Sequence, residues 1–365
     1  MADITIARGT CHPLYVFEIG QLVDLEGCER RIQDTSERLA LKQRGRLSHF
    51  QYRPPPLRIT QPTGQNQIGG YAVAPTVELV LYGFGAMSVS YAIPFAGSLD
   101  SLVEMSIGLR ARPDLASDAR ARVTALVTSL GSLVSKPKVA DIFEDYALFA
   151  VQGIEPARDA SHFLETESGT LARILRAERG VLSADEVLDA MQASISFGVG
   201  DISIIDYDTG IVLDPEPEEV RAVLEVANVQ LLEMRYLDQE LDQALQRSHA
   251  LLARQGGWKS LSPRAYAGDL AEVAELQLDS AMLLERVTNA LKFFGEEYPT
   301  RIYRLASRRF HLGEWDQGIS RKLGTIESLY QKLADRAEGR RMEMLEWVVI
   351  VLIALEIILS FRPGH

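Results

Sequence analysis

An apolar run close to the C-terminus constrains this chain more than any other feature. Residues 347–361 read WVVIVLIALEIILSF, and only Glu356 and Ser360 are polar. A helix of this length rises about 22 Å at about 1.5 Å per residue. Met344 and Leu345 extend it toward the ~20 residues that span a bilayer core. We therefore predict a membrane anchor over residues 344–362, with a buried core helix or an apolar oligomer seam as the alternatives.

The residues at the two ends of this run fit a membrane interface. Arg340 and Arg341 precede it, Arg362 follows it, and Trp347 stands where interfacial aromatic residues gather. A carboxylate in mid-bilayer is costly, so we expect Glu356 to face a neighbouring copy of the segment. The predicted anchor consists of Trp347, Val348, Val349, Ile350, Val351, Leu352, Ile353, Ala354, Leu355, Glu356, Ile357, Ile358, Leu359, Ser360 and Phe361.

Basic residues gather just before the anchor in a chain that is acidic as a whole. The net charge of the chain is −12, yet residues 301–343 carry a net charge of +4. A basic segment beside an apolar anchor attracts anionic lipid and favours the cytoplasmic side. An RNA or acidic-partner contact, or a simple solvated face, would give the same pattern. We name as the basic collar Arg301, Arg304, Arg308, Arg309, Arg340 and Arg341.

Apolar residues recur with coiled-coil spacing on the helix that leads into the anchor. Intervals of four and three residues separate the positions, which predicts an oligomer seam. An antiparallel helix hairpin within one chain would give the same spacing. The seam comprises Ile319, Leu323, Ile326, Tyr330, Leu333 and Ala337.

The rest of the chain predicts an α+β fold: a mixed N-terminal part, long C-terminal helices, a coiled-coil-like helix and the transmembrane helix. Alternating apolar residues indicate strands at residues 14–19, 77–82, 86–94, 145–153, 194–197, 202–206 and 211–213, with a hairpin turn at Gly83-Phe84-Gly85. Helical spacing covers 21–41, 101–133 with an interruption at Pro113, and most of 216–361. Ser183 and Glu186 form a capping box that opens a short helix to Gln192. We expect a strand–helix unit (1–42), a Pro/Gly-rich linker (43–75), an α+β domain (76–214), a helical region (215–343) and the anchor (344–362).

Composition argues against several kinds of site. The two cysteines and six histidines show no metal-ligand spacing, so we expect neither a metal nor a cofactor. The acidic balance argues against direct nucleic-acid binding, because phosphate affinity depends on clustered Lys and Arg. The first residues resemble neither a signal peptide nor a transit peptide.

The sequence Asp206-Tyr207-Asp208-Thr209-Gly210 is the best enzyme-like motif. Two aspartates one residue apart after an apolar strand are typical of haloacid-dehalogenase-type phosphatases, and Asp-Thr-Gly is the aspartic-protease triplet. The phosphatase order after the second aspartate is reversed here, and a protease needs two such loops. A tight hairpin turn accounts for the motif. We assign no catalytic residue; the alternative is a membrane-tethered hydrolase or phosphatase that uses Asp206 and Asp208.

The C-terminal part resembles a known family. The residues Leu345-Glu346-Trp347 and Glu356-Ile357, the preceding helix with Leu329-Tyr330, and the stretches DISIIDYDTGIVLDP and ERVTNALKFFGEEYPTRIYRLASRRF are similar to the "required for meiotic nuclear division" family. The similarity covers roughly the last 190 residues. The family has no established catalytic residues. Its mitochondrial members form homo-oligomers at the inner membrane and support translation.

Together these features predict a membrane-anchored oligomeric scaffold or assembly factor. The resemblance implies a bacterial member in the inner membrane with its N-terminal domain in the cytoplasm. The expected partners are membrane lipid, further copies of the chain, and a ribosome or another protein.

Overall fold

The computed structural model describes residues 4–32, 35–38, 55–111, 113–156, 159–254 and 298–328, together with residues 274, 278, 331, 346, 349, 350, 352 and 353. The chain divides into two compact units. The first comprises Met1–Tyr236 and Glu285–Trp315, and the second comprises Leu237–Leu284 and Asp316–His365.

The elements follow one another along the chain as a mixture of strands and helices. The strands are β1 (Thr5–Glu18), β2 (Leu22–Val23), β3 (Thr35–Arg38), β4 (Leu57–Pro62), β5 (Gln67–Ile68), β6 (Tyr71–Ala72), β7 (Thr76–Leu81), β8 (Ala86–Ser90), β9 (Ile93–Ser98), β10 (Val134–Ser135), β11 (Phe143–Glu155), β12 (Ser194–Ile195), β13 (Ile202–Ile205) and β14 (Thr209–Leu213). The helices are α1 (Leu25–Arg31), α2 (Leu99–Ala111), α3 (Asp114–Leu130), a 3₁₀ turn (Gly131–Leu133), α4 (Ala160–Arg176), α5 (Ala184–Gln192), α6 (Glu218–Arg254) and α8 (Tyr298–Arg309).

A single large sheet organises the first unit. Its strand order is β12-β13-β14-β11-β1-β8-β7-β4-β3, with β9 also paired to β1. The pairs are antiparallel except β11 with β14, which run parallel. The two long strands at its centre, β1 and β11, pair from Thr5↔Glu155 to Phe17↔Phe143.

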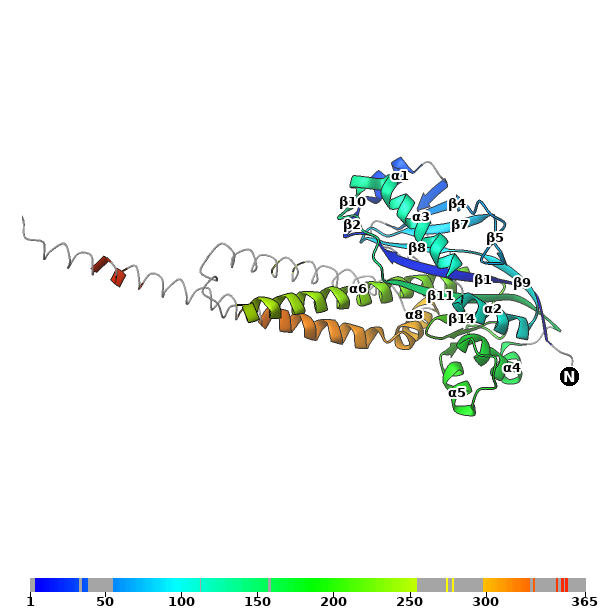
Figure 1. The fold of residues 1–365 in the computed structure, drawn as a ribbon. Coiled ribbons are helices and arrows are strands. Elements are labelled where there is room, and N and C mark those ends of the chain that lie inside the picture. Colours follow the sequence, from blue (N-terminus) through cyan, green and yellow to red (C-terminus); the bar gives the residue numbers. More distant parts are fainter. Residues whose placement is uncertain are drawn as a thin grey trace, which may run out of the picture. The chain divides into compact units, whose positions relative to one another are not determined.

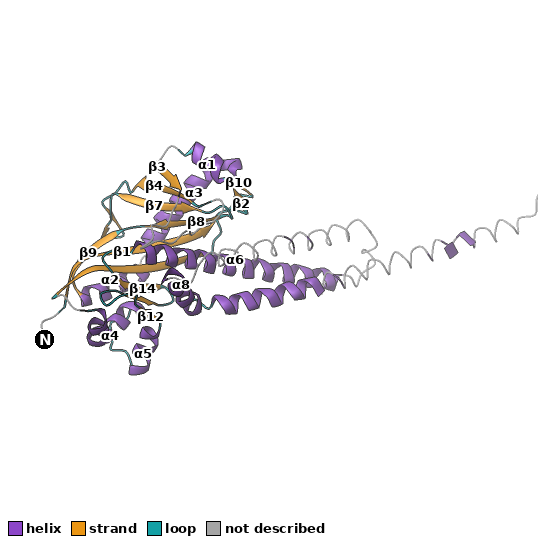
Figure 2. Ribbon diagram, turned by 180° about the vertical axis from the view of Figure 1, so that it is seen from behind, coloured by secondary structure: helices purple, strands orange, loops and turns teal. Residues whose placement is uncertain are grey.

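Helices cover both faces of this sheet. Every side chain of β1 from Pro13 to Glu18 is buried, as expected for a strand that is covered on both sides. Cys11, Tyr15 and Phe17 belong to the apolar core that α2 and α3 complete on one face, and Figure 1 shows α3 lying across the sheet. On the other face, which carries Leu14 and Val16, lies the N-terminal part of α6 (Figure 2).

Several local predictions are confirmed. β7 and β8 form an antiparallel hairpin around Gly83–Gly85, and helix α3 begins directly after Pro113. Ser183 caps α5, because its Oγ accepts a hydrogen bond of 3.2 Å from the amide of Glu186.

Two stretches differ from the prediction. The helix expected over residues 21–41 is only α1, and the strand β3 follows it. The expected linker over residues 43–75 contains β4, β5 and β6. β4 buries Leu57 and Ile59 against the core and pairs along its length with β7. The prolines at 54–56 therefore precede a strand, and burial of alternate apolar residues outweighs the polar composition of the stretch.

The fold is α+β, as predicted, and it is built on a large mixed sheet. Among the residues that the structure describes, no helix is long and apolar enough to cross a membrane. The transmembrane helix predicted over 344–362 is therefore not supported by this part of the chain. Except for residues 346, 349, 350, 352 and 353, it lies outside the described residues.

Candidate functional site: a ring of arginines and aspartates

The Asp-Tyr-Asp motif forms the turn between β13 and β14. Strand β13 is buried throughout, and the turn closes with a hydrogen bond of 2.9 Å from the amide of Asp206 to the carbonyl of Thr209. The carboxylate of Asp206 also accepts a hydrogen bond of 2.9 Å from the amide of Tyr207. The interpretation of this motif as a tight hairpin turn is confirmed.

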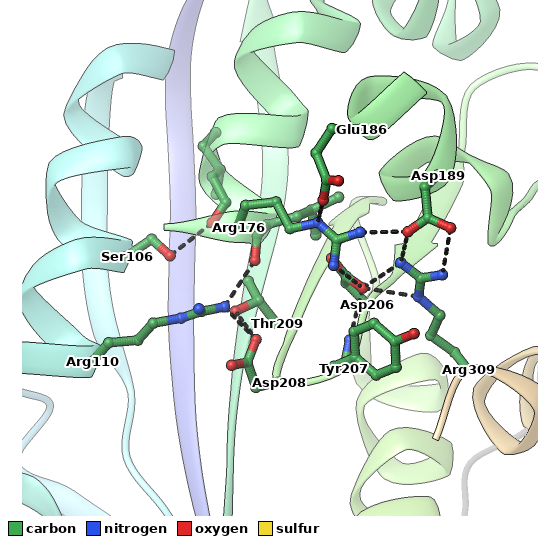
Figure 3. Close-up of polar contacts among 12 residues, drawn as sticks. Ser106, Arg110, Arg176, Glu186, Asp189, Asp206, Tyr207, Asp208, Thr209 and Arg309 are labelled. Carbon is green, nitrogen blue, oxygen red and sulfur yellow. Dashed lines mark hydrogen bonds and ion pairs between the residues drawn. The ribbon is translucent and has the colours of Figure 1, made fainter. Parts of the chain in front are cut away.

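Asp206 belongs to a closed ring of four charged side chains, which we call the charge ring: Arg176, Asp189, Asp206 and Arg309 (Figure 3). Arg176 ends α4, Asp189 lies on α5, and Arg309 ends α8. Each arginine contacts both aspartates, so the ring joins three helices to the β13–β14 turn.

The contacts that Asp206 makes in the charge ring are short and well shielded from water. Nη2 of Arg309 lies 2.7 Å from Oδ1 of Asp206 and 2.7 Å from Oδ2 of Asp189. Nη1 of Arg176 lies 2.9 Å from Oδ2 of Asp206. The Asp206 side chain is 1% exposed and that of Arg309 is 9% exposed. Burial of such a pair costs a large desolvation free energy, which the attraction between the two charges offsets. Loss of one partner therefore removes the attraction while the other charge stays buried.

The two aspartates of the ring have opposite pKa shifts because they differ in burial. Burial raises the pKa of Asp206, and the guanidinium groups of Arg309 and Arg176 oppose this only in part. Hydrogen bonds from Arg309 and Arg176 lower the pKa of Asp189, which is far more accessible to water. Burial would lower the pKa of Arg309, but its hydrogen bonds to Asp189 and Asp206 outweigh this and raise it.

Asp208 has a different partner, although it stands only two residues from Asp206. Its carboxylate pairs with Arg110 in α2, which also donates a hydrogen bond of 3.0 Å to the carbonyl of Leu175. Both members of this pair are about 40% exposed (40% and 42%). The two aspartates are therefore turned to different arginines, and Figure 3 shows this separation.

We call the charge ring together with the Arg110–Asp208 pair the clasp. Arg176 and Arg309 pair with Asp206 and are also held by Asp189, and Arg110 pairs with Asp208. Within the described ranges, no group of three or more His, Cys, Asp or Glu side chains could hold a metal ion. A phosphatase-like use of Asp206 and Asp208 would require these arginines to move away first.

Tyr207 lies on the outside of the clasp. The Cζ atom of Arg309 is 4.4 Å from the centre of the Tyr207 ring, and that of Arg176 is 5.8 Å away. The ring of His311 also stacks on that of Tyr207, with 5.7 Å between the two ring centres. Tyr207 is 46% exposed, so its ring is accessible to solvent, as are the side chains of Asp189 and His311.

A second group of charged residues is buried between α6 and the sheet. Arg221 pairs with Glu78 at 2.7 Å, and Arg235 pairs with Glu144. Glu225 accepts a hydrogen bond from Ser88. These contacts hold the first half of α6 on a sheet face that is partly polar.

A small cavity lies within this interface and is lined by His12, Leu14, Ser90, Tyr146, Leu148, Arg221, Leu224 and Glu225. Its volume of about 10 Å³ is close to the space that one water molecule requires. It is too small for an organic substrate.

The structure separates the members of the basic collar. Arg301, Arg304 and Arg308 are exposed on one side of α8, and no ion pair joins any of them to another residue of the described segments. Arg309 is turned inward to the charge ring. Arg340 and Arg341 lie outside the described residues. We refer to Arg301, Arg304 and Arg308 as the arginine row.

The oligomer seam is only partly described. Ile319 and Ile326 are buried within the chain, and Leu323 is half-buried. Between them, Lys322 contacts Asp238 at 2.7 Å and Asp242 at 2.6 Å, both on α6. An intrachain antiparallel pairing therefore accounts for these positions. Tyr330, Leu333 and Ala337 lie outside the described residues, and self-association stays a prediction.

Sequence reasoning did not find the charge ring. Arg176, Asp189 and Arg110 carry no motif, and Arg309 stands beside three exposed arginines on the same helix. One weak signal exists: on α8 Arg309 falls on the side of the buried residues Ile302 and Ala306, whereas its neighbour Arg308 does not.

Comparison with known proteins assigns the first unit to a family. A family model described as "Uncharacterized protein MJ0711, N-terminal domain" matches residues 8–219. "Uncharacterized protein MJ0711" of Methanocaldococcus jannaschii is 23% identical over 234 residues, which cover 63% of this chain and 69% of that protein. No solved structure matches.

The matched region begins in β1 and ends at the start of α6, so it contains the sheet and three members of the charge ring but not Arg309. A domain of unknown function is thus confirmed, while the resemblance to the "required for meiotic nuclear division" family stays a prediction. The chain belongs to the family of the MJ0711 N-terminal domain.

Proposed function

We propose that this protein is an oligomeric scaffold held at a membrane by its C-terminal segment, with the MJ0711-type domain presented to a partner on the cytoplasmic side. The observation that carries the proposal is the exposure of large apolar side chains in the predicted anchor. Val349, Ile350, Leu352 and Ile353 are each 51–60% exposed. Contiguous apolar surface of this kind is costly in water and marks contact with a membrane or another protein.

The arginine row supports the same proposal. Arg301, Arg304 and Arg308 form no ion pair with another residue of the described segments, although carboxylates are in excess in a chain of net charge −12. Residues 301–343, which begin with the arginine row and precede the predicted anchor, carry a net charge of +4, and a basic segment of this kind favours anionic lipid at the cytoplasmic face. The C-terminal resemblance adds a more specific expectation, namely support of translation with a ribosome as partner.

The charge ring favours a scaffold over the hydrolase alternative. It ties α8 to the β13–β14 turn and buries Asp206 between Arg176 and Arg309, while Asp208, which is 42% exposed, is paired with Arg110. We therefore keep Asp206 and Asp208 as structural residues in the proposal.

Fractionation of the full chain against a 1–343 truncation tests the proposal. We expect the full chain to float with anionic vesicles and to resist carbonate washing, and the truncation to stay in the aqueous fraction. If the full chain also stays in the aqueous fraction, the membrane function is wrong.

A matched pair of variants distinguishes insertion of the predicted anchor from nonspecific binding of the chain to vesicles. Val349→Lys with Ile353→Lys should abolish flotation without shortening the chain, because two charges in the anchor oppose insertion. Val181→Lys, at a side chain that is 99% exposed in the first unit, should leave flotation unchanged. Equal loss in both variants would contradict the anchor.

A further inference from the structure

Two glutamates meet inside the first unit, where α6 lies on the sheet (Figure 2). Glu18 ends β1 and points to the same face as Leu14 and Val16, because side chains alternate along a strand. Glu233 lies on α6. Glu18 is 3% exposed and Glu233 is 2% exposed, and their side chains form a hydrogen bond with each other. We call this contact the carboxyl pair.

The hydrogen bond within the carboxyl pair requires a proton on one of its two members. An ionised carboxylate only accepts hydrogen bonds, so two carboxylates cannot bond to each other. Oε2 of Glu18 is buried, and it accepts no hydrogen bond from an N–H or hydroxyl group of the described residues. A buried carboxylate without a donor or a cation is costly. These observations favour the proton on Glu18, with its O–H donated to Glu233.

The surroundings of Glu18 oppose its ionisation. Burial raises the pKa of the Glu18 carboxyl well above its ordinary value of 4.5, and the negative charge of Glu233 and the hydrogen bond to it raise this pKa further. Ionisation would break the hydrogen bond and place two negative charges in contact where water is excluded. Repulsion between like charges is strong at such a distance in a protein interior. The contact between α6 and β1 is therefore favourable while the carboxyl pair holds a proton.

The elements packed around Glu18 bring no cation to its carboxyl group within the part of the chain that the structure describes. The amide of Ala140 donates a hydrogen bond of 2.9 Å to the carbonyl of Glu18, and a Cβ at Gly85 would lie 3.1 Å from Oε1 of Glu18. Backbone thus closes these two sides. The other titratable and charged groups of this region have partners of their own or face water. They are Glu78 with Arg221, Glu144 with Arg235, Glu225 with Ser88 and Tyr82, Tyr303 with Gln230, His12 beside Arg221 in the small cavity, and the exposed Lys138.

We propose that the carboxyl pair is a proton-operated latch: Glu18 stays a neutral acid at neutral pH, donates its proton in a hydrogen bond to Glu233, and frees this part of α6 from β1 when it ionises. Glu233 stands three residues before Tyr236, where α6 passes from the first unit to the second. Loss of the proton therefore loosens the helix at the end of its path through the first unit. The latch involves the first unit alone and is independent of membrane attachment.

Glu18→Gln in the full chain tests the latch, because the side-chain amide N–H donates to Glu233 at every pH. Infrared spectra of the original chain at pH 7 should contain the C=O stretch of a protonated carboxyl that this variant lacks. The folded state binds the Glu18 proton more tightly than the unfolded state. The equilibrium constant of unfolding should therefore rise about tenfold per pH unit above pH 4.5 on account of this proton, until the folded state also loses it. Glu18→Gln should remove this tenfold factor.

Hydrogen exchange locates the effect in the structure. Between pH 6 and 9, the protection factors of the amides of residues 229–236 should fall in the original chain and stay level in Glu18→Gln. The amides of α3, which lies on the opposite face of the sheet, should respond alike in both chains. A general loss of stability would instead change the protection of α3 and α6 together.

Matched variants separate Glu18 from the other buried glutamates. Added to Glu144→Gln, the Glu18→Gln substitution should remove a further factor of about ten per pH unit, because each residue binds its own proton. Glu165→Gln, at an exposed glutamate of α4, should leave the pH dependence unchanged. If Glu18→Gln does not fold, Glu233→Gln supplies the N–H donor from the other side, and the same loss of pH dependence is expected.

Two results would overturn the latch. One is the absence of a protonated-carboxyl band from the original chain at pH 7, which needs no variant. The other is a folded Glu18→Gln or Glu233→Gln variant whose unfolding and α6 exchange depend on pH as in the original chain.

Discussion

Arg309 Nη2 lies 2.7 Å from Asp206 Oδ1, although 103 residues separate the two in the chain. One residue ends α8 and the other begins the β13–β14 turn, so a single contact ties a helix from beyond residue 297 to the domain that the family model covers. The fold of this domain in isolation would lack that partner. The Arg309–Asp206 ion pair is therefore a contact through which the family domain and α8 stabilise each other.

Replacement of Asp206 by alanine should destabilise the first unit strongly. The change removes the more buried of the two aspartates that hold Arg309 and Arg176 and leaves Asp189, which is 45% exposed, as their shared partner in the ring. Breaking a buried ion pair costs about 3–5 kcal/mol. Asp208→Ala removes an exposed partner of Arg110 in the same turn and should cost only about 0–1 kcal/mol. Urea unfolding of both variants measures the difference, and equal losses would contradict the structural role of the ring.

Gly210→Ala should be destabilising for a steric reason. A Cβ at this position of β14 would lie 2.6 Å from the Tyr146 hydroxyl and 3.2 Å from Leu148 Cδ1. Overpacking of a filled core costs about 1–3 kcal/mol. Tyr146→Phe removes the closer atom, so the substitution should cost less in that background. Thermal unfolding of the two single variants and the double variant tests this coupling, and strict additivity would count against it.

The sequence predicted the parts of this fold that depend on local chemistry. Ser183 and Glu186 identify a helix start, and the β13–β14 turn follows from its own residues, because both depend on neighbours within four positions. Arg309 and Asp206 could not be paired in this way. An ion pair between distant segments produces no periodic pattern in the sequence. The sequence therefore does not distinguish an arginine that closes a buried ring from an arginine that faces water.

The same limit explains β4. Its partners β3 and β7 supply its hydrogen bonds, and the apolar core buries Leu57 and Ile59, whereas its own sequence follows three prolines and precedes a Gly-rich stretch. Strand formation depends on such partners more than helix formation does.

His12 should make the first unit less stable in mild acid. Burial and the charge of Arg221 lower its pKa to about 4 from 6.5, opposed by Glu78 and a backbone hydrogen bond with Tyr91. The folded state thus binds the proton more weakly than the unfolded state. The stabilising contribution is present above pH 6.5 and is lost as the pH falls toward 4, by up to about 3 kcal/mol.

His12→Gln should remove this dependence. Unfolding free energies of the original chain and the variant, measured between pH 7 and 4, should converge toward the acid end. His162→Gln serves as the control at an exposed histidine. A parallel pair of curves for His12→Gln and the original chain would show that His12 does not titrate with unfolding.

Glu144 should act in the opposite direction. Burial raises its pKa to about 7 from 4.5, although Arg235 opposes the shift. The folded state holds this proton more tightly than the unfolded state, so its contribution is complete below pH 4.5 and is lost as the pH rises through 7. Glu144→Gln should flatten the fall in unfolding free energy between pH 5 and 8. An unchanged slope in the variant would exclude Glu144 as its source.

Ile319→Ala distinguishes the two interpretations of the apolar repeat before the anchor. Ile319 is completely buried within the chain, and neighbouring Lys322 is held by Asp238 and Asp242 of α6. Loss of a buried isoleucine costs about 2–5 kcal/mol. If the pairing is intrachain, the second unit should lose this stability to the same extent at every protein concentration, with the particle size unchanged in sedimentation. A loss that disappears at high concentration, together with a smaller particle, would place Ile319 in a seam between copies instead, because mass action stabilises only an intermolecular contact.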